Sequence, residues 1–338
     1  MVVVLTTASH AQNNTKYPSV IDSLVTILRT SQEDTSQVNL LNQLTQESTI
    51  IGKYEKALQY AQSALKLSKE LAFEKGEARA NSNAGTIYWY LGNYDKALEC
   101  YQNSFNIWKG LNDKPGIAAS YNSIGIIYIM QGNYEKALEI QLKSLRIRED
   151  INDKRGMANT YNSIGVIHWK KENLDLAIES YLEGLKLWKE LGEKKGIAAV
   201  YNNIGIIYNT KAEYDKALEI YLNCLEIHKE LGDKKGIAQS YNNIGSIYYD
   251  KGNILLKRNQ PSKANEQYNK ALENHLQSLT IRIEIRDQQG IAMSHNNIGS
   301  VYMKQGKVKD ALYHLERSLT IFKELGDKDG VKDSYLTL

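Results

Sequence analysis

The chain has 338 residues, which is longer than one ordinary domain, so we expect either several domains or an array of repeats. Its 42 basic and 39 acidic residues leave a net charge of +3, and this even balance excludes the basic footprint typical of nucleic-acid binding. The apolar fraction of 42% and the charged fraction of 24% exclude a disordered chain, and no apolar run approaches the roughly 18 residues of a membrane span.

The beginning of the chain, residues 1–17, allows two interpretations. The run MVVVLTTASHAQ is short, has no basic residue in front of it, and contains Ser9-His10-Ala11, which fits a small-x-small cleavage site. Residues 1–17 are therefore either the remnant of an export signal, which would place the repeats in the periplasm, or the frayed N-terminus of a cytoplasmic protein. Residues 18–37 are predicted to form an N-terminal capping helix, because four apolar residues share one helical face: Ile21, Leu24, Val25 and Leu28.

Small residues then recur every 40 positions. Two ladders of glycine and one of alanine keep this period: Gly85, Gly125, Gly165, Gly205 and Gly245; Gly76, Gly116, Gly156, Gly196 and Gly236; Ala57, Ala97, Ala137, Ala177 and Ala217. A period of 20–50 residues indicates a solenoid of stacked units.

One copy, residues 118–157, shows how the period maps onto helices. Tyr121, Gly125 and Tyr128 follow helical spacing and predict one face of a first helix. Gly132-Asn133 breaks that helix, and Tyr134 begins a second one. In a later copy, Gly232 suits a left-handed helix C-cap.

Glycine inside the first helix costs about 1 kcal/mol relative to alanine, so a contact must offset this cost in each copy. We expect the paired helix to come close at Gly125, with Ala137 opposite and with Tyr121 and Tyr128 filling the space around the contact. Because one helix pair has too little core alone, neighbouring pairs must stack.

The pattern aromatic-x-x-Ile-Gly-x-x-Tyr, followed by Gly-Asn-Tyr-x-Lys-Ala-Leu, resembles the tetratricopeptide repeat. The 40-residue period exceeds that family's usual 34 and is similar to the long-helix variant of Pins-type adaptors and bacterial signalling arrays. The resemblance covers residues 38–338 and implies an all-α, right-handed superhelical solenoid of about seven antiparallel helix pairs. It also implies a concave groove, lined by the first helix of each pair, that holds an extended peptide or a partner helix.

The predicted repeats are residues 38–77, 78–117, 118–157, 158–197, 198–237, 238–291 and 292–331. The first is degenerate, because Leu41 and Thr45 occupy the tyrosine and glycine positions. Residues 332–338 match only the beginning of another first helix, so we expect the chain to be part of a longer protein.

The sixth repeat carries 14 extra residues, 254–267, between Gly252-Asn253 and Tyr268. Fourteen residues are almost four helical turns, so two turns added to each helix would preserve the register. The reversal would then lie near Asn259-Gln260-Pro261-Ser262. A tolerated loop and a protruding contact site are both open interpretations.

The sequence contains no catalytic motif. Gly192-Glu-Lys-Lys-Gly196 lacks the Lys-Ser/Thr and the preceding strand of a phosphate-binding loop. His168 and His295 occupy positions that hold tyrosine in other copies, and Cys224 occupies a small-residue position, so we interpret all three as packing residues. No cysteine or histidine spacing is typical of metal ligands. We therefore expect no enzyme activity, metal or cofactor within these residues.

The predicted groove carries two rows of asparagine. The first row is Asn42, Asn122, Asn162, Asn202, Asn242 and Asn296, with Ser82 at the missing position, and the second is Asn83, Asn203, Asn243 and Asn297. Asparagine offers a donor and an acceptor, so such rows can pair with the backbone of an extended peptide, as related solenoids do. The alternative is that these side chains bond the backbone of turns or of neighbouring helices.

One helical turn further on, the groove position is variable and often aromatic: Trp89, Ile129, Trp169, Asn209, Tyr249 and Met303. Trp89, Trp169 and Tyr249 are candidate anchors for a partner, and packing on the adjacent helix is the alternative.

The sequence thus favours a scaffold that binds a protein or peptide segment in the groove. The alternative is a sensory or regulatory region of a larger bacterial signalling protein, such as a histidine kinase or nucleotide cyclase, with its catalytic part beyond residue 338.

Overall fold

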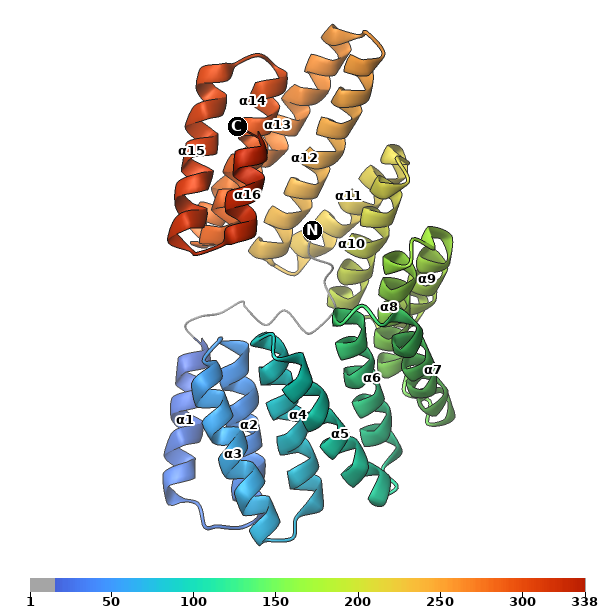
Figure 1. The fold of residues 1–338 in the computed structure, drawn as a ribbon, viewed down its shortest axis with the longest axis vertical. Coiled ribbons are helices and arrows are strands. Elements are labelled where there is room, and N and C mark those ends of the chain that lie inside the picture. Colours follow the sequence, from blue (N-terminus) through green and yellow to red (C-terminus); the bar gives the residue numbers. More distant parts are fainter. Residues whose placement is uncertain (1–15, 338) are drawn as a thin grey trace. The chain divides into compact units, whose positions relative to one another are not determined.

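The computed structural model describes residues 16–337, which form α-helices joined by short turns, with no β-strand among them. The chain divides into two compact units, whose boundary in the sequence lies between Leu191 and Gly192. Within each unit, consecutive helices pack against one another as antiparallel pairs (Figure 1). The predicted all-α architecture of stacked helix pairs is confirmed. The cleavage-site prediction at Ser9-His10-Ala11 lies outside the described residues.

The helices of the first unit are α1 (Lys16–Thr30), α2 (Thr35–Ile50), α3 (Tyr54–Glu70), α4 (Glu74–Tyr90), α5 (Tyr94–Gly110), α6 (Lys114–Met130), α7 (Tyr134–Asp150), α8 (Lys154–Lys170) and α9 (Leu174–Glu190). Those of the second unit are α10 (Lys194–Thr210), α11 (Tyr214–Glu230), α12 (Lys234–Lys257), α13 (Pro261–Glu284), α14 (Gln288–Lys304), α15 (Val308–Glu324) and α16 (Lys328–Thr337). The even-numbered helices from α2 to α14 are the first helices of the repeats, and the odd-numbered helices from α3 to α15 are the second helices.

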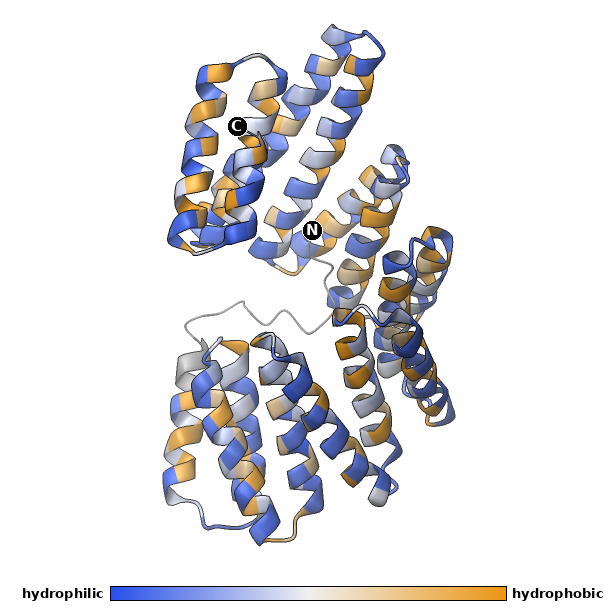
Figure 2. Cartoon of the chain, viewed as in Figure 1, coloured by the Kyte–Doolittle hydropathy of each residue, from blue (hydrophilic) through white to orange (hydrophobic). Residues whose placement is uncertain are grey.

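Each helix buries one side and leaves the other in solvent. Figure 2 shows hydrophobic and hydrophilic residues alternating along the helices, which is the pattern of amphipathic elements. The centre of the core repeats with the sequence, because one aliphatic position on the first helices is almost inaccessible in six consecutive copies: Ile87, Ile127, Ile167, Ile207, Ile247 and Val301. On α1, Leu24 is buried, while Ile21, Val25 and Leu28 are part-buried on the same face.

The turns between helices are fixed by left-handed residues and side-chain caps. Gly132 has φ +76°, and the following amide, Asn133 N, donates to Tyr128 O at 2.9 Å, which closes the end of α6. Gly232 has φ +64°, so its predicted left-handed conformation is confirmed. At the start of α8, Gly156 N donates to Asp153 Oδ1 at 2.9 Å.

The glycine inside each first helix makes room for a large side chain of the paired second helix. A Cβ atom at Gly125 would lie 2.6 Å from Gln141 Nε2, so the residue opposite this glycine is Gln141 and the prediction of Ala137 was wrong. Ala137 is fully buried one turn earlier on α7. The other copies present the following side chains to their glycines: Tyr101 to Gly85, Tyr181 to Gly165, Tyr221 to Gly205, His275 to Gly245 and Leu315 to Gly299.

The second glycine ladder joins neighbouring repeats in the same way. A Cβ atom at Gly116 would lie 2.4 Å from the Trp108 ring, which belongs to the preceding second helix. This position holds tryptophan, phenylalanine, arginine or histidine in different copies. In two copies an aspartate of the turn pairs with it: Arg148 Nη1 lies 2.8 Å from Asp153 Oδ2, and His228 Nδ1 lies 3.0 Å from Asp233 Oδ2.

A third repeated contact uses a small side chain on the second helix. Ser144 Oγ donates to Ala118 O at 2.8 Å, and Cys224 Sγ lies 3.4 Å from Ala198 O at the equivalent position two repeats later. Cys224 is buried, so its interpretation as a packing residue is confirmed.

The 14 extra residues of the sixth repeat lengthen both of its helices. α12 and α13 have 24 residues each, against 17 in α10 and α11, so each gains seven. The reversal lies at residues 258–260, where Asn259 has φ +56°, and no separate loop forms. The extension repeats the core contact, because Tyr268 packs over Gly252 as His275 does over Gly245.

None of the helices in the described part of the chain is long and apolar enough to cross a membrane.

Candidate binding surface

The two predicted asparagine rows pair with each other across neighbouring first helices. In the first unit, Asn83 Nδ2 donates to Asn42 Oδ1 at 2.9 Å. In the second unit, Asn243 Nδ2 donates to Asn202 Oδ1 at 2.9 Å, and Asn297 Nδ2 donates to Asn242 Oδ1 at 2.8 Å. Each pair joins one repeat to the next, so these amides fix the spacing between first helices.

The first row is largely buried as a result. Asn42, Asn162, Asn202 and Asn242 are buried, whereas Asn83, Asn243 and Asn297 of the second row are part-exposed; Asn203 is buried. The three pairs bond through their side-chain amides, whereas the alternative left open by the sequence had these side chains bonding to backbone. A role in holding a peptide backbone stays a prediction, and it falls mainly to the part-exposed members.

Two asparagines of the first row lack such a partner. Asn122 Oδ1 and Asn296 Oδ1 are buried without a hydrogen-bond partner among the described residues. The residues 41 positions later explain this, because they are Ser163 and Thr337 rather than asparagine. The hydroxyls of both bond to a carbonyl of their own helix, Asn159 O and Asp333 O respectively. Asn122 and Asn296 thus keep unused acceptors on part-exposed residues.

The predicted aromatic anchors are half-buried. The Trp89 ring lies 4.7 Å from Tyr90, whose own ring stacks on Tyr54 at 5.4 Å. Tyr249 lies 5.9 Å from Tyr268, and Lys170 Nζ lies 4.7 Å from the Trp169 ring. Each anchor therefore packs within the protein and keeps part of its surface in solvent, which is compatible with both interpretations.

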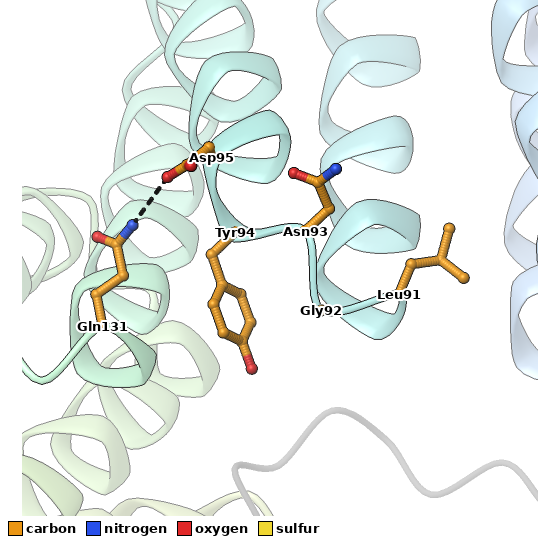
Figure 3. A pocket seen from close by; sticks show the side chains of 6 residues that line it. All are labelled: Leu91, Gly92, Asn93, Tyr94, Asp95 and Gln131. Carbon is orange, nitrogen blue, oxygen red and sulfur yellow. Dashed lines mark hydrogen bonds between the residues drawn. The ribbon is translucent and has the colours of Figure 1, made fainter.

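A shallow depression of about 460 Å³ lies beside the turn between α4 and α5, lined by Leu91, Gly92, Asn93, Tyr94, Asp95 and Gln131 (Figure 3). Gln131 Nε2 donates to Asp95 Oδ1 at 3.4 Å across it. The sequence analysis missed this feature. The sequence feature that could have indicated the depression is Leu91. This apolar residue is half-exposed at a turn position that holds Gln131, Lys171 and Lys211 in the next repeats.

From α6 to α14 the first helices contain a single acidic residue. α6, α8, α10 and α14 contain none, and α12 contains only Asp250. Asp250 is part-buried near the end of the exposed first-helix face, and the amide of Asn209 on the neighbouring first helix bonds to its carboxylate. The sequence analysis did not single out this residue, although its position holds no other acid in any repeat.

The histidines of the second unit occupy packing positions. His275 is wholly buried with no partner for Nδ1 among the described residues, and burial followed by the charge of Arg282 lowers its pKa to about 3. His295 Nδ1 lies 2.8 Å from His314 Nδ1, and their rings pack 5.0 Å apart. Burial and then His314 lower the pKa of His295 to about 4. The sequence analysis overlooked His314, which belongs to a different helix from His295.

His168 is part-buried, and burial lowers its pKa. No group of three or more His, Cys, Asp or Glu residues within the described range is arranged to hold a metal ion.

Comparison with known proteins identifies the repeat. A family model described as tetratricopeptide repeat matches residues 76–150, 156–221, 196–277 and 263–324, which is more than half of the chain. A comparison with curated proteins gives no match for this chain.

Solved structures share the fold at low sequence identity. The apo form of the quorum sensor NprR from B. thuringiensis superposes with a TM-score of 0.66 and 14% identity over 91% of this chain and 83% of that one. BtubC from P. vanneervenii gives 0.58 and 20%, over 69% of this chain and 92% of its own. A Rap protein complexed with competence and sporulation factor gives 0.56 and 13%, over 95% of both chains.

Proposed function

The chain belongs to the tetratricopeptide repeat family, whose repeats form protein-interaction scaffolds rather than enzymes, and we propose that it binds an extended or helical partner segment along its first helices. The observation that supports this proposal most strongly is the composition of the first-helix face. Within each unit it combines part-exposed asparagines with half-buried aromatic rings, and α6, α8, α10 and α14 contain no acidic residue.

This face suits a polypeptide because it offers both kinds of contact that a peptide needs. Part-exposed amides such as Asn243 and Asn297 can bond to the backbone of a peptide, each at a net gain of about 1 kcal/mol. The exposed parts of Trp89 and Tyr249 can cover apolar side chains.

A second proposal is that the chain is a sensory or regulatory region of a bacterial signalling protein. It is supported by the fold likeness to the quorum sensor NprR and to a Rap protein that was solved with competence and sporulation factor. In this case the bound segment would be a regulatory peptide that acts as a signal, rather than part of a structural partner. Sequence identities as low as those of NprR and the Rap protein show a shared fold and no shared role, so this second proposal is the weaker one.

A display library of short random peptides tests the first proposal. Binders are selected on the wild-type chain, labelled with a fluorophore, and measured by anisotropy. We expect the Trp89→Ala and Tyr249→Ala variants to weaken binding about tenfold for peptides that use these anchors. Leu142→Ala, which removes an exposed leucine from the second helix α7, is the matched control and is expected to change nothing.

The proposal is wrong if no peptide binds the folded chain, or if the control variant weakens binding as much as the two aromatic variants do. Circular dichroism on each variant separates lost binding from lost structure.

A further inference from the structure

The 14 extra residues of the sixth repeat extend the α12–α13 hairpin as two packed helices that run side by side (Figure 1). Tyr268 covers Gly252, and its hydroxyl donates to Asn253 Oδ1 at 2.9 Å. Farther out, Ala264 is buried and Leu255 packs against the same cluster. Because each helix gains seven residues, the turn between them lies about 10 Å beyond the ordinary end of a helix pair.

The base of this hairpin is joined to the next repeat at the usual position. In the fifth repeat, Asp215 accepts a hydrogen bond from Lys251 Nζ of the next first helix at 2.7 Å. The equivalent residue of the sixth repeat is Asn269, which accepts from Gln305 Nε2 at 2.8 Å, and Gln305 Nε2 also lies 3.0 Å from Asn265 Oδ1. The link between repeats is thus complete without the residues of the turn.

The turn carries three basic side chains that no acid neutralises. Lys257, Arg258 and Lys263 are exposed and form no ion pair among the described residues. Residues 254–267 contain one acid, Glu266, against these three bases. The first turn of α13 has no acidic residue, whereas the first turn of every other second helix from α3 to α15 has one. The end of the hairpin is therefore a local positive charge that the repeat pattern does not supply elsewhere.

An exposed apolar residue lies beside these charges. Leu256 directly precedes Lys257 and is 43% exposed, while its neighbour Leu255 already packs against the core of the hairpin. Burial of an exposed leucine by a partner adds affinity, and charges around it add specificity and a faster association rate. The end of the hairpin thus offers both kinds of contact at one place.

We propose that the hairpin tip, which consists of Leu256, Lys257, Arg258 and Lys263, binds an acidic segment of a partner protein. Carboxylates of that segment pair with the three bases, and one of its apolar side chains covers Leu256. Of the two interpretations that the sequence left open for residues 254–267, this one is the protruding contact site. The tip is separate from the asparagines and aromatic rings of the first-helix face, so this inference does not rest on the function proposed above.

Two other anionic partners fit the hairpin tip less well. The affinity of a protein for nucleic acid grows with the number of phosphates that it contacts, and a net charge of +3 for the whole chain provides no wider basic surface around these three bases. A membrane surface calls for a broader apolar face than a single exposed leucine. An acidic peptide needs no more than the three charges and one apolar contact.

The test selects peptides that need the hairpin tip. A display library of random peptides is bound to the wild-type chain and depleted on a chain that lacks residues 254–267, and we expect the remaining binders to be rich in aspartate and glutamate. If circular dichroism shows that the shortened chain is unfolded, the variant Lys257→Glu/Arg258→Glu/Lys263→Glu replaces it in the depletion step.

A fluorescent peptide from this selection is then measured by anisotropy against the wild-type chain, Leu256→Gln and a charge-neutralised tip, Lys257→Gln/Arg258→Gln/Lys263→Gln. The matched control removes the same charge from the neighbouring turn between α14 and α15, where three exposed lysines are changed in Lys304→Gln/Lys307→Gln/Lys309→Gln.

The charge-neutralised tip is expected to weaken binding about tenfold or more and Leu256→Gln about threefold, while the control stays within about twofold of wild type. Raising the salt from about 50 mM to about 300 mM should weaken binding to the wild-type chain and have little effect on the charge-neutralised tip. Binders without acidic residues, no binder that needs residues 254–267, or an equal loss in the control would each overturn this inference. Tighter tip-dependent binding of a DNA oligonucleotide or of phosphatidylserine vesicles than of any peptide would overturn it as well.

Discussion

Asn243 donates its side-chain amide to Asn202 Oδ1 at 2.9 Å, and the two residues stand 41 positions apart on neighbouring first helices. The same relationship joins Asn83 to Asn42, so one contact geometry recurs in both units. These hydrogen bonds link neighbouring repeats, and peptide binding by the same rows stays a prediction.

Asn202→Ala should therefore reduce stability, because it leaves the Asn243 amide without its acceptor. We expect a loss of about 1–2 kcal/mol, measured by urea unfolding or by local hydrogen exchange in α10 and α12. Asn122→Ala is the matched control, since Asn122 Oδ1 has no partner to lose among the described residues. Equal losses at the two positions would contradict the pairing.

Gly205→Ala should destabilise the fifth repeat although alanine is the better helix former. The added Cβ would lie 2.6 Å from the Tyr221 ring, and we expect overpacking to cost about 1–3 kcal/mol beyond the gain of about 1 kcal/mol in helix propensity. In a Tyr221→Ala background, Gly205→Ala should no longer lower the thermal midpoint, since the first repeat combines Thr45 with Ala61 at these two positions. A single variant more stable than wild type would refute the close contact.

His275 should make the second unit sensitive to acid. Its folded pKa of about 3 lies below the ordinary value of 6.5, so the unfolded chain binds the proton more readily, and stability falls as the pH drops below 6.5. Between pH 7 and pH 5 the loss should be about 2 kcal/mol, and His275→Tyr, the residue of three other repeats, should remove it. The measurement is the unfolding free energy against pH for both proteins, and parallel curves would count against a buried neutral imidazole.

His228 should have the opposite effect at higher pH. Burial alone would lower its pKa, but hydrogen bonds with Asp233 and Cys224 outweigh burial and raise the pKa to about 9. The stabilisation is complete below pH 6.5 and is lost as the pH rises towards 9, on the order of 2 kcal/mol. His228→Trp, which places the residue of Trp108 and Trp188 here, should flatten the stability profile in that window; a profile unchanged by this variant would exclude the ion pair as its cause.

Deleting residues 254–267 should leave a folded chain. The deletion joins Asn253 to Tyr268, which reproduces the Asn133-Tyr134 junction of the third repeat and shortens each helix by seven residues. We expect a cooperative thermal transition by circular dichroism, with the midpoint lowered by a few degrees because the Gly252–Tyr268 contact is replaced by an ordinary turn. Loss of cooperative unfolding would show that the long hairpin holds the sixth repeat together.

The helix pairs could be predicted from the sequence, because helical periodicity and glycine turns are local signals. It also predicted the added turns of α12 and α13, since seven residues per helix preserve the side that faces the core. It failed at contacts that depend on how two helices cross. Nothing in the order of residues distinguishes Ala137 from Gln141 as the side chain above Gly125, because both lie on the same face of α7 one turn apart.

The asparagine rows show the same limit. Both rows were visible, yet the pairing requires knowing that position 42 of one first helix meets position 83 of the next. The contact between His295 and His314 likewise joins two helices, so neither residue reveals it alone. Asp250 was recognisable in principle, as an acid at a position that otherwise holds none, but its lack of a cationic partner among the described residues emerges from the packing.

The long hairpin of α12 and α13 also limits how this fold can vary in length. Seven residues advance a helix by almost two whole turns, with a drift of only about 20°. An insertion must supply this increment to both antiparallel helices, since a gain in one alone would have no partner to cover it. Repeats of this type should accordingly grow by one such heptad in each helix at a time, so that hairpin length is quantised, and insertions of other sizes should appear as excursions of the turn instead.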